Sequence, residues 1–244
     1  MKKALTIVGL FIGINATAQV ATSGTTNSGT NASAIGYQSS ATNTVSTAIG
    51  RETLASGITS TAMGYQTSAT NTASTAIGNS STASGVTSTA IGNNSTASGE
   101  TSIAMGFETE ATDSASIAMG YQTTSTGGAS TAMGFITTAS GFGSTSIGYK
   151  TTASGYGSTS IGYQTTASGN SSTAIGKNTI ASDFGSLVIG QYNLGGATVT
   201  YSATEANYAN TAFVIGNGTG ECLLNLLFVF DEFLLILLFY YSDE

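Results

Sequence analysis

A hydrophobic pair recurs along the chain with a fixed period: isoleucine or methionine followed by glycine, every 14 residues and without an insertion. Between these pairs lies a second marker, mostly Ala-Ser-Gly or Ala-Thr-Asn, whose last residue is Gly, Asn or Asp. These residue types tolerate a left-handed backbone, so each unit carries two turn signals. The glycines of the recurring pair are Gly36, Gly50, Gly64, Gly78, Gly92, Gly106, Gly120, Gly134, Gly148, Gly162, Gly176 and Gly190.

The interval between turns leaves room for strands of about four or five residues. A helix is disfavoured, because Gly, Ser and Thr would recur in every helical turn. Two short strands and two turns, repeated in phase, describe one coil of a β-solenoid. The sequence therefore predicts an all-β fold, a parallel β-roll or β-solenoid of 14-residue coils over residues 32–190, about 11 to 12 coils long.

Alternation of side chains along a strand assigns the two faces of the first strand. We expect Ile49 to point inward because it is the large apolar residue, and Thr47 shares its face. Ser46 and Ala48 then point outward. By this assignment the core contains Ile49, Ile77, Ile91, Ile147, Ile161 and Ile175.

On the second strand, uniformity assigns the faces. The position of Thr53 is Ser or Thr in all units, whereas that of Leu54 varies, so Thr53 and Ala55 are expected inside. Such a coil gains roughly 3–4 kcal/mol from apolar burial. Ordering all of its residues costs more than this gain, at about 1–2 kcal/mol for each residue. We therefore expect the small, uncharged outward face that carries Ser46 and Ala48 to pack against other copies in an oligomer.

Composition excludes several classes of function. Charged residues make up 7% of the chain, where about 25% is usual. With 5 Lys and Arg against 12 Asp and Glu, the chain has no basic stripe for a nucleic acid. It has no histidine to act as a general base, and its single Cys222 cannot form an internal disulfide. We expect no enzyme activity, no catalytic residue and no cofactor.

A cluster of carboxylates is the one candidate for metal binding. Glu100, Glu108, Glu110 and Asp113 could form an acidic patch, but they lack the dense oxygen-ligand loop of calcium sites. We interpret them as a solvated face and expect no metal site.

The two ends of the chain differ from the repeats. Lys2 and Lys3, an apolar run and the triplet Ala16-Thr17-Ala18 predict a signal peptide over 1–18, hence export, followed by a linker over 19–31. After Gly190 the period breaks, and residues 191–220 are expected to hold an insertion and a closing coil.

Residues 221–244 are rich in leucine and have three interpretations. Their abrupt change in composition favours a non-native end produced by a frameshift or truncation. A membrane or interface anchor is the second interpretation, which the adjacent carboxylates of Asp231 and Glu232 oppose. The third is a packed cap.

Aromatic residues follow many of the recurring glycines, where we expect them to be exposed at a turn. Neighbouring coils would stack them about 5 Å apart. Such rows can bind proteins or glycans; alternatively, they stack on one another or pack at subunit edges and only protect the roll. The candidate adhesive file is Phe107, Tyr121, Phe135, Tyr149 and Tyr163, and a partial second file is Phe142, Tyr156 and Phe184.

Units such as STAIGNSSTASGVT (74–87) and STSIGYQTTASGNS (158–171) resemble the head repeat of trimeric autotransporter adhesins, the YadA-like family. The resemblance covers residues 32–190. It implies a left-handed parallel β-roll packed as a homotrimer, on the surface of a bacterium, that attaches without catalysis to host matrix, to cell-surface proteins or glycans, or to abiotic surfaces. The family's stalk and membrane barrel are not recognisable here, so membrane contact is expected only through a missing anchor or the tail.

Two other functions fit a repetitive solenoid. An ice-binding protein presents flat arrays of threonine, and a spacer or fibre uses length alone. Ice binding is disfavoured, because Thr47-type residues share the inward face with isoleucine and only one outward file is rich in threonine. That file includes Thr82, Thr96, Thr124, Thr138, Thr152 and Thr166.

Overall fold

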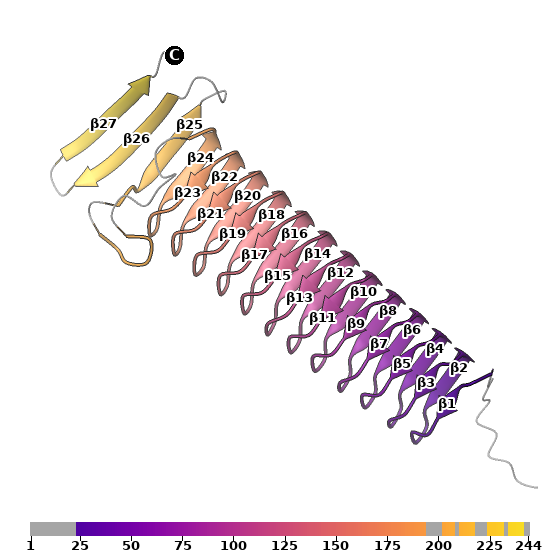
Figure 1. Ribbon diagram of the computed structural model, residues 1–244. Coiled ribbons are helices and arrows are strands. Elements are labelled where there is room, and N and C mark those ends of the chain that lie inside the picture. Colours follow the sequence, from indigo (N-terminus) through magenta and orange to yellow (C-terminus); the bar gives the residue numbers. More distant parts are fainter. Residues whose placement is uncertain (1–22, 194–201, 208–209, 218–223, 232–233, 242–244) are drawn as a thin grey trace, which may run out of the picture.

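The structure, a computed structural model, describes residues 23–193, 202–207 and 210–217, and the backbone of 224–231 and 234–241. The repeats form a parallel β-solenoid in which a long strand and a short strand alternate along the chain (Figure 1). The long strands hydrogen-bond into one sheet and the short strands into another. The expected signal peptide over 1–18 lies outside the described residues.

Each long strand contains five residues and begins after the turn that holds the second marker. The long strands are β2 (Ser33–Tyr37), β4 (Thr47–Arg51), β6 (Thr61–Tyr65), β8 (Thr75–Asn79), β10 (Thr89–Asn93), β12 (Ile103–Phe107), β14 (Ile117–Tyr121), β16 (Thr131–Phe135), β18 (Thr145–Tyr149), β20 (Thr159–Tyr163), β22 (Thr173–Lys177), β24 (Leu187–Gln191) and β25 (Phe213–Asn217).

The short strands contain two residues each, fewer than the four or five expected. They are β1 (Thr26–Asn27), β3 (Ser40–Ala41), β5 (Leu54–Ala55), β7 (Ser68–Ala69), β9 (Thr82–Ala83), β11 (Thr96–Ala97), β13 (Glu110–Ala111), β15 (Thr124–Ser125), β17 (Thr138–Ala139), β19 (Thr152–Ala153), β21 (Thr166–Ala167) and β23 (Ile180–Ala181).

Neighbouring coils pair in parallel at an offset of one repeat, so that like residues lie side by side. Ala90 pairs with Ala104 and Gly92 with Gly106, for example. The backbone bonds continue through the turns, where the Thr59 N–H donates to the Thr44 carbonyl at 2.9 Å. Because the spacing never changes over residues 33–191, each outward position generates an unbroken file along the solenoid.

The interior of each coil is filled by alanine and by small hydroxyl residues. Ala48 and Ala55 are fully buried, and so are Ser46 and Thr53. Hydroxyls bond locally within this space: Ser60 Oγ donates to the Gly57 carbonyl at 2.7 Å. The two sheets therefore lie too close together to enclose a larger side chain in most coils, although valine occupies the position of Ala48 at Val188 and Val214.

The expected faces of the first strand were wrong. Thr47 and Ile49 point outward, and Ser46 and Ala48 point inward. None of the six isoleucines assigned to the core is buried: Ile49, Ile77, Ile91, Ile147 and Ile161 are partly exposed, and Ile175 is exposed. The reason is steric, since the narrow interior accepts Ala or Ser at this position. The faces of the second strand agree with expectation, with Thr53 and Ala55 inside and Leu54 partly exposed.

Backbone geometry at the turns also differs from expectation. The second marker, such as Gly57, does not adopt a positive φ; the left-handed residue lies two positions later, where Thr59 has a φ of 55°. At the first marker, Gly106 has a φ of 137°, and a Cβ on it would lie 1.9 Å from the Gly120 carbonyl oxygen. The recurring glycine is therefore required by both conformation and close approach.

The C-terminal coils depart from the regular pattern. The Asn193 side-chain amide completes the edge of the short-strand sheet, because it accepts from the Ile180 N–H at 2.8 Å and donates to the Ile180 carbonyl at 3.0 Å. β25 resumes the long sheet by pairing in parallel with β24. Strands β26 (Leu224–Asp231) and β27 (Leu234–Tyr241) then extend that sheet as an antiparallel pair. Within the described residues, no helix is long and apolar enough to cross a membrane.

Candidate functional site

The outward face of the long sheet, called here the long-sheet face, carries an unbroken file of Ile and Met from β2 to β24. Each strand presents its first, third and fifth residues there, and the third is Ile or Met from β2 to β24. Met63 is 37% exposed and Ile175 39% exposed, large fractions for such side chains in a regular sheet. Sequence reasoning missed this surface because it placed these side chains in the core.

An aromatic ladder runs along one border of the long-sheet face, at the ends of β12, β14, β16, β18 and β20. Successive rings lie 4.8–5.2 Å apart with interplanar angles of 5–6°. Stacking covers the ring faces, so the ladder presents ring edges and tyrosine hydroxyls to its surroundings. The structure thus brings together the whole predicted file Phe107, Tyr121, Phe135, Tyr149 and Tyr163.

Towards the N-terminus, the same file contains a cation in place of a ring. The Arg51 guanidinium lies 5.7 Å from the Tyr37 ring centroid and 5.4 Å from that of Tyr65. Arg51 Nε also contacts Glu52 Oε1 at 3.0 Å, and Gln66 Nε2 donates to Glu52 Oε2 at 2.8 Å. This part of the border is therefore polar, unlike the ladder.

The second predicted file is only partly assembled. Phe142 and Tyr156 stack with ring centroids 5.4 Å apart and are 56% and 59% exposed. Phe184 lies two coils beyond Tyr156, with Asn170 between them in the file. Part of the insertion lies against this end, since the Phe184 N–H donates to the Ser202 carbonyl at 2.9 Å.

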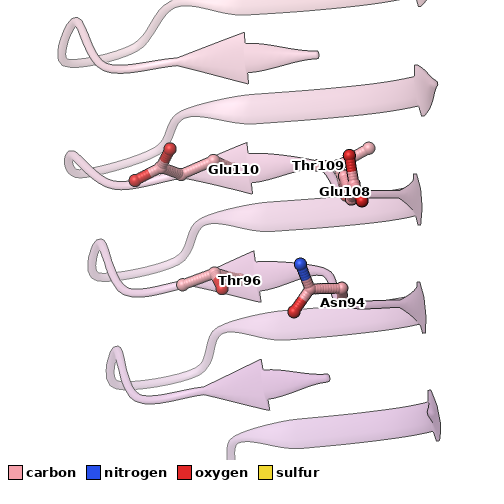
Figure 2. Close-up of a pocket in the computed structure, with 5 residues that line it drawn as sticks. All are labelled: Asn94, Thr96, Glu108, Thr109 and Glu110. Carbon is pink, nitrogen blue, oxygen red and sulfur yellow. The ribbon is translucent and has the colours of Figure 1, made fainter. Parts of the chain in front are cut away.

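The structure does not bring three carboxylates of the acidic patch together. Glu108 and Glu110 line a shallow depression with Asn94, Thr96 and Thr109 on adjacent coils, and the two carboxylates point apart (Figure 2). Glu108 Oε2 instead accepts from Gln122 Nε2 at 2.7 Å. In the part of the chain that the structure describes, no three His, Cys, Asp or Glu side chains are grouped to hold a metal ion.

The threonine files also differ from expectation. Thr47-type residues point outward beside the Ile and Met file. Outward threonines therefore occur on the long-sheet face and also on the short strands. The parity argument against ice binding was therefore wrong. Among the described residues, outward hydroxyls, apolar side chains and aromatic edges lie in parallel files along the solenoid.

This regular 14-residue coil with a small-residue interior defines a class of repetitive β-solenoid heads. The family model for the YadA head domain repeat matches residues 28–53, 55–81, 83–109, 111–135, 139–165, 153–179 and 167–192. The chain belongs to this family, an adhesin-like repeat family that is not enzymatic. A comparison with curated proteins gave no match.

Proposed function

We propose that the chain is the head of an exported adhesin of the bacterial cell surface, which works as a homotrimer and attaches to host matrix or cell-surface proteins. The observation that supports an attachment role best is the aromatic ladder, five aligned rings at the border of a rigid sheet. Membership of the YadA head family supports the surface location and the trimer.

The long-sheet face supports the trimer. A file of Ile and Met side chains, each partly exposed or exposed, runs along the repeats, and a contiguous exposed apolar surface marks an interaction site. Three long-sheet faces that meet around a three-fold axis would bury this file, while the ladder at its border would stay near the outside. The packing surface is therefore the face with Ile49, not the Ser46 and Ala48 face expected from the sequence.

The stacked geometry favours a protein ligand over a glycan. Sugars bind to the faces of aromatic rings, but the neighbouring rings cover the faces within the ladder. Ring edges and phenol hydroxyls instead suit the mixed apolar and polar surface of a protein.

Replacing Tyr121, Phe135, Tyr149 and Tyr163 together by serine is expected to reduce attachment at least about tenfold, if the lost contacts are worth more than about 1.4 kcal/mol. The trimer should remain, because the Ile and Met file is unchanged. Attachment of the purified chain to immobilised matrix proteins and to cultured cells measures the effect, with light scattering for the mass.

The control replaces Ile58 and Val86 by serine, two exposed apolar residues on a different turn. It should leave attachment unchanged. If the ladder variant attaches as well as the unmodified chain, the ladder is not the contact surface and serves to protect the roll.

The outward threonines leave ice binding as the competing function. We expect no thermal hysteresis from the folded chain, because trimer formation would bury the threonines of the long-sheet face beside the Ile and Met file. A clear hysteresis gap together with a monomeric mass would favour the ice-binding function over the adhesin.

A further inference from the structure

A periodic interface leaves the alignment of its partners undetermined. Each coil advances the solenoid by about 4.8 Å, and like residues repeat without slip over the long strands. If all coils presented the same residues, a neighbouring copy could shift by one coil and lose the contacts of one coil only. Strands with a uniform sequence can slip in register within a sheet, and whole solenoids with uniform coils can slip along one another in the same way.

The long-sheet face breaks this periodicity at two neighbouring coils. From β2 to β22, the first outward residue is Ser or Thr in every strand except β12 and β14, where it is isoleucine. These two strands also carry methionine at the third position, so the apolar surface is widest there. The four residues, called here the register patch, are Ile103, Met105, Ile117 and Met119.

The register patch is available for contact with another chain. All four side chains are partly exposed, although the alanines between them, Ala104 and Ala118, are fully buried. Strand pairing places Ile103 beside Ile117 and Met105 beside Met119. The result is one contiguous apolar area with threonine on both sides, at Thr89 and Thr131.

We propose that the register patch sets the axial alignment of the three chains. This inference rests on the trimer proposed above. With the chains in register, the three patches meet at one level of the three-fold axis. After one chain shifts by one coil, its Ile103 lies at the level of Thr89 in the neighbouring chain. Ile117 of that neighbouring chain then lies at the level of Thr131 in the shifted chain. Burying those hydroxyls against isoleucine without a hydrogen bond is unfavourable, so the aligned arrangement is selected.

A second wide region lies at the C-terminal end, where β24 and β25 begin with Leu187 and Phe213. Four coils with threonine separate β14 from β24. The spacing of the two regions means that a small shift cannot superpose one on the other. The competing explanation is that this end alone aligns the chains.

Methionine methyl groups report the alignment in the full chain. A trimer in register has three equivalent chains, so each methionine gives one methyl signal in the nuclear magnetic resonance spectrum. A relative shift of any chain removes the symmetry and splits the signals. Met63 and Met133 are suitable reporters, because both lie on the long-sheet face outside the register patch and are 37% and 36% exposed.

The decisive variant is Ile103→Thr with Ile117→Thr, which gives β12 and β14 the threonine of their neighbours. We expect the mass of a trimer to persist and the single signals of Met63 and Met133 to split into two or more. Adding Thr75→Ile and Thr89→Ile to this variant places a new pair of isoleucines on β8 and β10. This variant should restore single signals, because the new pair lies at the same level in all three chains.

The matched control is Ile58→Thr with Ile136→Thr, two exposed isoleucines outside the long-sheet face, and it should leave single signals. Single signals in the decisive variant would overturn the register patch and assign alignment to the C-terminal end. A monomeric mass for the unmodified chain would overturn the trimer itself, and the register patch with it.

Discussion

Replacing Gly106 by alanine is expected to destabilise the solenoid by more than about 3 kcal/mol, the range of mutations that force a backbone clash. The added Cβ would lie 1.9 Å from the Gly120 carbonyl oxygen, and the φ of 137° is open essentially to glycine. Neither constraint can relax alone, because β12 and β14 pair along their whole length. Thermal unfolding followed by circular dichroism measures the loss.

Gly143→Ala is the matched control for this prediction. Gly143 also has a positive φ, 64°, but nothing lies within 4 Å of the Cβ that alanine would add. The equivalent residue one coil earlier is Ala129, with a φ of 54°. We expect a loss of about 1–2 kcal/mol, the cost of the left-handed backbone alone; equal effects of the two variants would show that the close approach at Gly106 does not constrain the coil.

The sequence predicted the solenoid because the constraint on each coil is local and recurs. Glycine at the close approach and a left-handed residue in the turn are needed in each coil, so their spacing gives the length of a coil directly. The long strands then follow in register. The length of the short strands did not follow, because turn signals mark where the chain bends and not how many residues pair between bends.

The faces of the long strand were wrong for a physical reason. Hydrophobicity places Ile49 inside, but the distance between the two sheets decides what fits, and that distance cannot be read from one strand. Uniformity gave the right answer on the short strand, at Thr53. The same criterion applied to the long strand would have favoured Ser46 and Ala48, whose positions hold small residues in nearly every coil.

The candidate surfaces followed from the sequence to different degrees. Stacking of the ladder could be predicted, since a fixed period aligns Tyr149 above Phe135 whatever the side-chain conformation. The separation of Phe184 from Tyr156 also follows from the period, which leaves Asn170 between them. The segment at Ser202 could not be placed, because it lies within the insertion that breaks the period.

With isoleucine outside, each coil buries less apolar area within its own chain than the sequence suggested. Alanine methyls and threonine methyls fill the interior, and the hydrogen bonds between coils hold the stack. The apolar area of the Ile and Met file remains in water unless another chain covers it. The correction thus strengthens the physical argument for assembly while moving it to the opposite face.

Replacing Ile147 and Ile161 by asparagine is therefore expected to convert the trimer into folded monomers. Burial of each isoleucine stabilises by about 2 kcal/mol, and each asparagine would also bury an amide without a hydrogen-bond partner among the Ile and Met side chains. Two such replacements per chain weaken association by several orders of magnitude. The interior is untouched, because the neighbouring Ser146 and Ser160 stay fully buried and bonded to Thr151 and Thr165 at 2.8 and 2.7 Å. Light scattering measures the mass, and circular dichroism the retained β-structure.

Ile58→Asn with Val86→Asn is the control for this change. Both residues are exposed, at 46% and 38%, but they lie in turns away from the long-sheet face. Their replacement should leave the mass of three chains. If both double variants remain trimeric, the long-sheet face is not the packing surface. If both become monomeric, the interface extends from the long-sheet face to these turns.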